Sequence, residues 1–226
     1  MAEAATEAPV RGTVEPGSIG VPADCLARAA GDSEKMLVVN ADDFGRSAAV
    51  NHATLLAYRE GILTSASLMV SGVAAGQAVE FARQNPTLAV GLHLVLADGV
   101  AALPAGEIPH LVDGHGNFRR GPGRAGIAYF FSRSARRELA KEIRAQFEQF
   151  ARTGLALSHV DGHCHLHLHP VVFDLVLPLA EKYEARAVRI VRDGLGVSWF
   201  HERRGLVRKL AWQMEFSLLG QRARRR

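Results

Sequence analysis

The feature that most constrains this chain is a histidine-rich stretch, HVDGHCHLHLHP, between residues 159 and 170. Five of the chain's ten histidines fall in it, and its ionisable imidazole and carboxyl groups all occupy odd positions. Since side chains along a strand alternate between two faces, an extended segment would place four of them on one face: His159, Asp161, His163 and His165. We predict a strand that ends in chemically active side chains. The alternative is a histidine-rich surface loop or an adventitious metal-binding tract.

Length and composition indicate one globular unit. The 226 residues are 48% hydrophobic and 22% charged, which suits a single α/β domain or part of a larger barrel. The two cysteines, Cys25 and Cys164, do not suggest a disulfide framework. Residues 1–33 lack the basic start and apolar segment of a signal peptide, so a disordered leader is predicted. No apolar run reaches the roughly 18 to 20 residues of a membrane span, and we expect a cytoplasmic protein.

The positive charge is concentrated at the end of the chain. The net charge is +4, yet residues 199–226 carry eight Lys and Arg against two Glu, so the remainder is close to neutral. This distribution argues against a protein that binds nucleic acid through its main surface. The apolar residues of 199–226 are interleaved with basic ones, which predicts an amphipathic helix. That helix either packs on the fold or contacts an anionic membrane surface peripherally.

From residue 36 onward, short apolar runs alternate with segments of helical periodicity. Besides the histidine stretch, strands are predicted at 36–39, 62–70, 88–96 and 187–191, and helices at 47–59, 73–84, 134–153 and 170–184. A βαβαβ order predicts a parallel sheet. Residues 97–126 are rich in Gly and Pro and long for a connection, which is typical of a binding loop or lid.

Local signals mark the ends of these elements. Ser47 suits a helix N-cap, while Gly61 and Gly154 suit helix ends. Pro170 fits the first turn of the last helix, and Pro178 is expected to kink or divide it. The helix at 134–153 presents one apolar stripe: Leu139, Ile143, Phe147 and Phe150.

Polar side chains recur where the predicted strands end. Asp42 and Asp43 follow the first strand, His93 closes the third and His163 closes the histidine strand. Because the carboxyl ends of parallel strands share one edge, we expect these residues to converge. The negative charge of two adjacent carboxylates beyond a buried strand needs a positive partner. An Asp with two His suits Zn²⁺ or a similar ion and leaves coordination positions open for water and substrate. Without this shared position at strand ends, the two aspartates would be interpreted as helix-capping and turn residues, and His93 as a core residue.

Three ordered motifs in this sequence resemble those of the YdjC/ChbG-like carbohydrate deacetylases. They are NADDFG at 40–45, GLHL at 91–94 and HVDGHCHLH at 159–167, and the resemblance covers about residues 36–191. Segments at 111–113, 128–131 and 135–139 resemble in particular the hopanoid-biosynthesis-associated branch. The resemblance implies a distorted (β/α) TIM-like barrel at residues 34–198 that removes acetyl groups from N-acetylated sugars with a divalent metal, Zn²⁺ or Mg²⁺.

Carried onto this sequence, the family's site would use Asp43, His93 and His163 as metal ligands and Asp42 as general base. His165 and His167 are kept as additional site residues. The family's late His-Pro-Gly motif has no match here, so the general acid is unassigned and the barrel is expected to be incomplete at its carboxyl end. For the hopanoid branch, the implied substrate is an N-acetylglucosaminyl hopanoid lipid.

Two rival functions remain from the sequence. One is a metal-binding relative without turnover, and the other is a different metal-dependent hydrolase such as a phosphoesterase. A phosphoesterase needs Arg or Lys near the metal motifs, where Arg46 is the one close in sequence. The expected partner is an N-acetylated glycan or glycolipid rather than nucleic acid, and a homodimer is compatible with the sequence.

Overall fold

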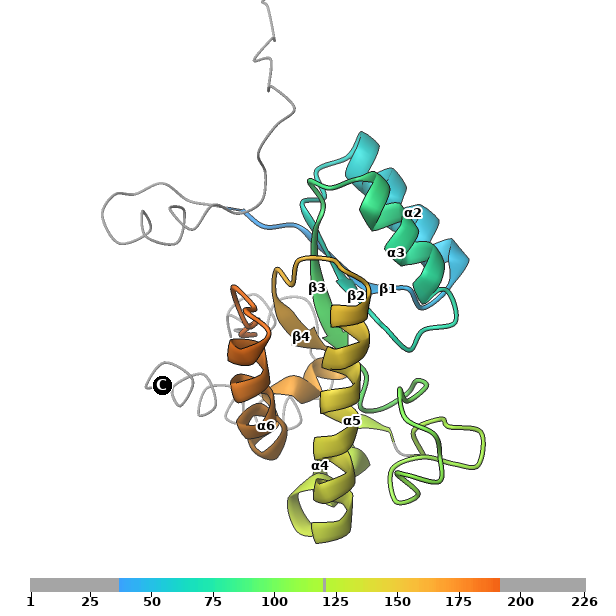
Figure 1. The fold of residues 1–226 in the computed structure, drawn as a ribbon, viewed down its shortest axis with the longest axis vertical. Coiled ribbons are helices and arrows are strands. Elements are labelled where there is room, and N and C mark those ends of the chain that lie inside the picture. The colour runs from blue at the N-terminus through green and yellow to red at the C-terminus, as the bar shows by residue number, and fades with distance from the viewer. Residues whose placement is uncertain (1–36, 120, 192–226) are drawn as a thin grey trace, which may run out of the picture.

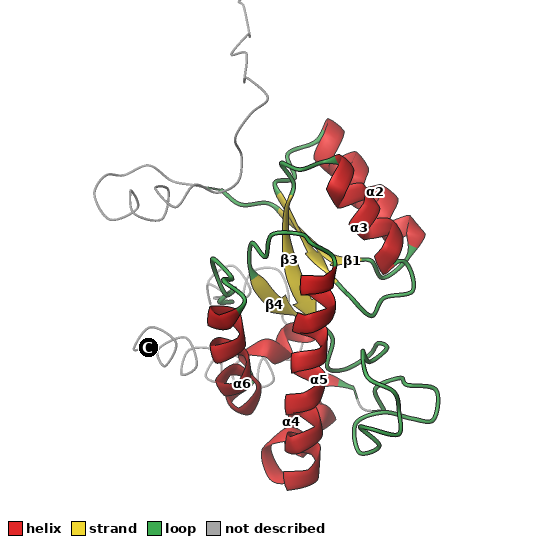
Figure 2. Cartoon of the chain, in the orientation of Figure 1, coloured by secondary structure: helices red, strands yellow, loops and turns green. Residues whose placement is uncertain are grey.

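The computed structural model describes residues 37–119 and 121–191 (Figure 1). Its strands are β1 (Asn40–Phe44), β2 (Ser65–Leu68), β3 (Ala89–Leu94) and β4 (Val160–Gly162). Its helices are α2 (Ala48–Glu60), α3 (Ala75–Gln84), α4 (Pro122–Phe131), α5 (Arg133–Arg152), the 3₁₀ segment η1 (His163–Leu168) and α6 (Pro170–Lys182). The predicted alternation of strands and helices is confirmed (Figure 2).

The four strands form one parallel sheet in the order β1-β2-β3-β4. Every crossover contains helix, as parallel neighbours require. Helices α2 and α3 lie side by side over one end of the sheet, whereas α5 runs beside β3 and β4 (Figure 1). Because all four strands run the same way, their carboxyl ends share one edge. That edge carries the polar residues that the sequence singled out.

Helix boundaries follow the local chemistry that the sequence predicts. Ser47 caps α2 by accepting a hydrogen bond from the backbone N–H of Val50 at 3.3 Å, and the N–H of Gly61 closes the helix on Ala57. Gly154 follows α5 with a φ of 73°, the left-handed conformation that glycine adopts without strain. Both helices therefore begin and end as predicted, within two residues.

The core lies between the sheet and α5. The predicted apolar stripe of α5 is buried, with Leu139, Ile143, Phe147 and Phe150 each 2% exposed or less. The same helix also buries polar side chains. The carboxylate of Glu142 accepts hydrogen bonds from the backbone N–H groups of Ala102 and Leu103, at 2.7 and 3.0 Å. This contact anchors the long connection that follows β3.

Several sequence-based expectations need correction. Strand β1 begins at Asn40, after the predicted strand 36–39, because Leu37 and Val38 are exposed. Part of the expected loop 97–126 is helical, since α4 begins at Pro122, and Pro178 lies within an α6 that is not divided. The fifth strand is reduced to one bridge, between Val160 and Val188.

The barrel is not confirmed. The four strands have the sequential order of a (β/α) barrel, but the sheet does not close within the described residues. The predicted leader, residues 1–33, and the basic segment, residues 199–226, lie outside those residues. None of the helices in 37–119 and 121–191 has both the length and the apolar character needed to cross a bilayer.

Candidate metal centre

A bulge in β1 brings the adjacent aspartates to the same edge. Ala41 pairs with Ala66 and Phe44 pairs with Leu68, so two residues of β1, Asp42 and Asp43, lie opposite one residue of β2. Asp43 has a φ of 63°, which Asp tolerates better than most residues. In a regular strand the two carboxylates would point to opposite faces. The bulge re-aims them, as bulges beside functional sites commonly do.

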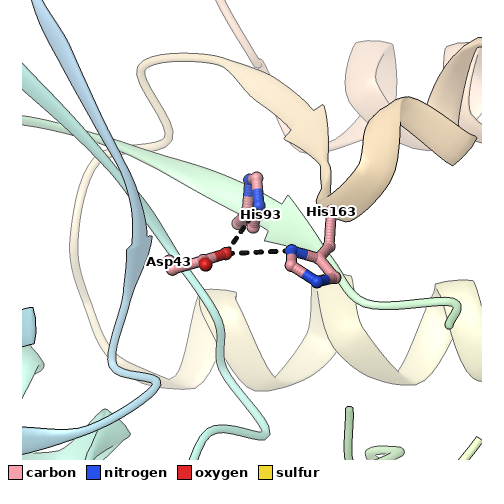
Figure 3. A group of neighbouring side chains, drawn as sticks. All are labelled: Asp43, His93 and His163. Atoms are coloured by element: carbon pink, nitrogen blue, oxygen red, sulfur yellow. Dashed lines mark hydrogen bonds and ion pairs between the residues drawn. The ribbon is translucent and has the colours of Figure 1, made fainter. Parts of the chain in front are cut away.

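The carboxylate of Asp43 lies between two imidazoles (Figure 3). Its Oδ1 is 3.3 Å from Nε2 of His93 and 3.0 Å from Nδ1 of His163. His93 comes from β3 and His163 from the first position after β4. One ligand atom from each of these three residues lies within 4.8 Å of the others. The convergence of Asp43, His93 and His163 predicted from strand ends is therefore observed.

The electrostatics of this cluster favour a cation. The hydrogen bond with His93 lowers the pKa of Asp43 well below its usual range against the opposing effect of burial, and Arg46, 2.8 Å from Oδ2, lowers it further. Burial by itself lowers the pKa of His93, but hydrogen bonds to Asp161 and Asp43 raise it to about 9. Both shifts show that this position favours a positive charge beside the carboxylates.

Asp161 holds His93 from the other side. Strands β3 and β4 pair His93 with Asp161, and Nδ1 of His93 donates to Oδ1 of Asp161 at 2.7 Å. Ser67 of β2 donates to Oδ2 of the same carboxylate at 2.8 Å. A carboxylate behind a histidine fixes the ring so that its other nitrogen faces the ligand position. Asp161 thereby directs Nε2 of His93 toward Asp43.

His159 also belongs to this layer, behind the cluster. Burial lowers its pKa, its Nε2 lies 2.9 Å from Oγ of Ser67 and its Nδ1 lies 2.8 Å from Oγ of Ser158. Gly91 makes room for the ring, since a Cβ there would come within 2.5 Å of the imidazole. His159 therefore supports Ser67, which in turn donates to Asp161, and it does not contact Asp43 directly.

Asp42 is paired with Arg189, a residue that the sequence reasoning missed. Nη1 of Arg189 lies 2.9 Å from both oxygens of Asp42 and 2.9 Å from Oδ2 of Asp161. Asn40 also donates to Asp42, at 2.7 Å. Arg189 is 147 positions away in the chain, so proximity in sequence could not identify it. The available signal was a single arginine within the apolar run AVRIV predicted as a strand.

The histidine stretch does not continue as a strand. Strand β4 ends at Gly162, and Cys164 and His165 take left-handed φ values of 53° and 57° within η1. The expected alternation through His165 is therefore wrong, and neither His165 nor His167 joins the cluster of Asp43. His167 is fully buried, and its Nε2 donates to the backbone carbonyl of Arg189 at 2.9 Å.

The donor set fits a divalent metal ion. One carboxylate and two imidazoles form the mixed oxygen and nitrogen set of catalytic Zn²⁺ sites, and the same three residues leave positions for water and substrate. Asp161 already orients His93, because it accepts a hydrogen bond from the ring nitrogen that faces away from Asp43. These residues are therefore suited to hold the ion.

Comparison with known proteins places the chain in a family. The family model described as YdjC-like protein matches residues 36–225, most of the sequence. The chain belongs to the YdjC-like family. This result confirms the resemblance at the level of the family, while its hopanoid-associated branch is not shown.

Curated relatives in this family are named as deacetylases. The chain is 45% identical to a carbohydrate deacetylase of Brevibacillus brevis over 65% of its own length and 56% of the relative. It is 42% identical to a carbohydrate deacetylase of Geobacillus stearothermophilus, over 69% and 60% of the two chains. A chitooligosaccharide deacetylase of Serratia marcescens is 38% identical, over 66% and 56%. The chain thus spans less than two thirds of the length of each of these relatives.

A solved structure shows the same arrangement of elements. It comes from Enterococcus faecalis V583 and is described as that of a cellobiose-phosphate cleavage protein. The two structures superpose with a TM-score of 0.61 at 32% sequence identity, covering 71% of this chain and 61% of the other. The α/β fold with its parallel sheet is therefore shared with this protein.

Proposed function

We propose that this protein is a metal-dependent hydrolase that removes the acetyl group from an N-acetylated sugar. The observation that carries the proposal is the cluster of Asp43, His93 and His163, with a further carboxylate, Asp42, beside it. The deacetylases named among the relatives support the same reaction class.

In this proposal the residues of the centre have separate roles as metal ligands and general base. Asp43, His93 and His163 hold a divalent ion, Zn²⁺ or Mg²⁺, which lowers the pKa of water and polarises the acetamide carbonyl when bound. Asp42 acts as general base and takes the proton of the attacking water. Arg189 and Asn40 hold its carboxylate in place, and 43% of its side chain is exposed and can meet substrate.

The finer proposal for the substrate is an N-acetylglucosaminyl hopanoid lipid. Support comes from the branch resemblance in residues 111–139 and from the surface of α4. Ile127, Phe130 and Phe131 of this helix are 64%, 51% and 76% exposed. Helix α4 contacts η1, which follows the strand carrying Asp161, and the ring of Phe130 lies 6.3 Å from that of His169. An apolar surface at this edge suits a sugar attached to a lipid.

Geometry disfavours the phosphoesterase alternative. A phosphate clamp needs cationic side chains free to meet the ligand. Arg46 is paired with Asp43 and Arg189 with Asp42 and Asp161. Within residues 37–119 and 121–191, the two arginines that contact the carboxylates of the centre are therefore already paired with them. The metal-binding relative without turnover is separated from the enzyme by an assay of acetate release.

The decisive test is the substitution Asp42→Asn, assayed for acetate release from N-acetylglucosaminides with added Zn²⁺ or Mg²⁺. We expect metal content to be unchanged and the rate to fall by about 100-fold or more, the scale for loss of a general base. Glu148→Gln is the matched control, because it removes an exposed carboxylate of α5 outside the cluster. Equal loss of metal and activity in Asp42→Asn would make Asp42 a ligand instead. A wild-type protein that binds metal but releases no acetate would be the relative without turnover.

Three further expectations stay predictions. They are a cytoplasmic location, a homodimer, and peripheral contact with an anionic membrane surface through the basic residues of 199–226. The first two have no bearing on the chemistry of the centre. The third fits a lipid-linked substrate.

A further inference from the structure

Two potential metal sites share His93 in this structure. The first is the cluster of Asp43, His93 and His163. The second consists of Asp42, His93 and Asp161, whose ligand atoms also lie within 4.8 Å of one another. Several classes of hydrolase hold two metal ions about 3.5 to 4 Å apart, so the second group is a candidate for a second ion. The second group, however, already contains a cation.

That cation is the guanidinium of Arg189. One nitrogen, Nη1, lies 2.9 Å from Oδ1 and Oδ2 of Asp42 and 2.9 Å from Oδ2 of Asp161. Asp161 is fully buried, and a buried carboxylate is strongly destabilised when it has no positive partner. A single nitrogen atom of Arg189 thus contacts both carboxylates of the second group.

The backbone fixes Arg189 in this position. Its N–H donates to the carbonyl of Val160 in β4 at 2.9 Å, and its carbonyl accepts from Nε2 of His167, also at 2.9 Å. Side-chain entropy is the usual cost of placing an arginine, and a backbone held on both sides confines the side chain to fewer positions. The buried imidazole of His167 therefore has a defined partner, which is the backbone carbonyl of Arg189.

We propose that Arg189 keeps this metal centre mononuclear by occupying the second cation position between Asp42 and Asp161. The inference rests on the proposed metal site at Asp43, His93 and His163. A guanidinium suits the task because it stays protonated at all accessible pH values and cannot be lost to a chelator. Its single positive charge compensates part of the negative charge of the two carboxylates, and a guanidinium does not act as a second Lewis acid. One ion is then left to activate water beside Asp42.

The proposal is tested by counting bound Mn²⁺ in titrations of the full chain, following free Mn²⁺ by its electron paramagnetic resonance signal. We expect the wild-type protein to bind one equivalent and Arg189→Met to bind one more. The second ion should be held by the group of Asp42, His93 and Asp161, whose two carboxylates are hard oxygen ligands suited to Mn²⁺. The resonance of the doubly loaded variant should show two coupled ions.

Matched variants separate this effect from general loss of charge. Arg189→Lys keeps a cation between Asp42 and Asp161 and should bind one equivalent of Mn²⁺. Arg46→Met removes an arginine that contacts Asp43 but neither Asp42 nor Asp161, and it should also bind one equivalent. The double variant Arg189→Met with Asp42→Asn should return to one. If Arg189→Met does not fold, Arg189→Gln is neutral, retains a hydrogen-bond donor and should also gain one equivalent.

The proposal is decided by the difference in bound Mn²⁺ ions between variant and wild type, rather than by the absolute number of ions. A folded Arg189→Met or Arg189→Gln protein with the wild-type number of ions overturns the proposal. A gain of one ion in Arg46→Met as well would also overturn it, because any lost positive charge would then have the same effect. A wild-type protein that binds no ion would instead reject the site at Asp43, His93 and His163, and with it the proposed function.

Discussion

At the scale of single residues, Asp43 organises the centre because it contacts both histidines and sits at the left-handed position of the β1 bulge. A substitution there would change the backbone as well as the ligand set. The histidines are better probes, since each contributes one side chain from a separate element. His163 is 14% exposed and is the first residue after β4.

We predict that His163→Ala abolishes stoichiometric binding of Zn²⁺, because two remaining ligands are too few for a stable site. His165→Ala is the matched control, being a histidine of the same 3₁₀ segment that lies outside the cluster. Elemental analysis after dialysis gives the metal content of both variants. If His163→Ala retained a full equivalent of Zn²⁺ and His165→Ala lost it, His165 and not His163 would be the metal ligand.

At the scale of elements, α5 does more than cover the sheet. Its buried polar side chains hold the connection that leaves β3 next to His93. Gln146 pairs with both the N–H and the carbonyl of Val95, at 3.0 and 2.7 Å, and Glu142 accepts from Ala102 and Leu103. Burial raises the pKa of Glu142, against the effect of those hydrogen bonds. The long connection is therefore fixed by specific contacts over this part of its length.

The contact can be tested by Glu142→Ala. Two backbone N–H groups would lose their acceptor, and an unsatisfied buried group costs about 1 to 3 kcal/mol. We expect the free energy of unfolding in urea to fall by about that amount. Glu148→Ala, on the same helix and 44% exposed, should change it by less than about 0.5 kcal/mol. Equal effects of the two substitutions would show that the buried hydrogen bonds of Glu142 contribute nothing specific.

At the scale of the whole molecule, one buried histidine makes stability depend on pH. Burial lowers the pKa of His167 to about 4, from a reference value of 6.5. Between these values the unfolded chain binds a proton that the folded protein excludes. The free energy of unfolding therefore falls as the pH drops from about 6.5 toward 4, by at most about 3 kcal/mol from this group.

We predict that His167→Gln removes this part of the pH dependence. Urea unfolding measured at several pH values between 7 and 4 should give a shallower decline for the variant than for the wild type, whatever the stability of each at neutral pH. Other buried histidines are common to both proteins and cancel in the comparison. Parallel curves would mean that His167 is protonated in the folded state as readily as in the unfolded chain.

The basic segment gives a second prediction at this scale. We expect weak binding to anionic vesicles that is lost at high salt, since each nearby Lys or Arg contributes about 1 kcal/mol. Deletion of residues 199–226 should abolish it in a sedimentation assay. Because the family match extends to residue 225, the deletion is paired with a full-length variant in which Arg203, Arg204, Arg208 and Lys209 become Gln. Undiminished binding by both variants would assign any contact to another surface.

The sequence by itself determined the parallel sheet, the helix ends and the convergence of Asp43, His93 and His163. These follow from local rules: apolar runs and periodicity set the elements, Ser47, Gly61 and Gly154 bound the helices, and parallel strands end at a common edge. The tertiary structure decided what depends on contacts between distant residues. It placed Arg189 between Asp42 and Asp161, set Asp161 behind His93, and ended β4 at Gly162 with left-handed residues after it. Such features depend on buried charges finding partners across the fold, a requirement that no local pattern records.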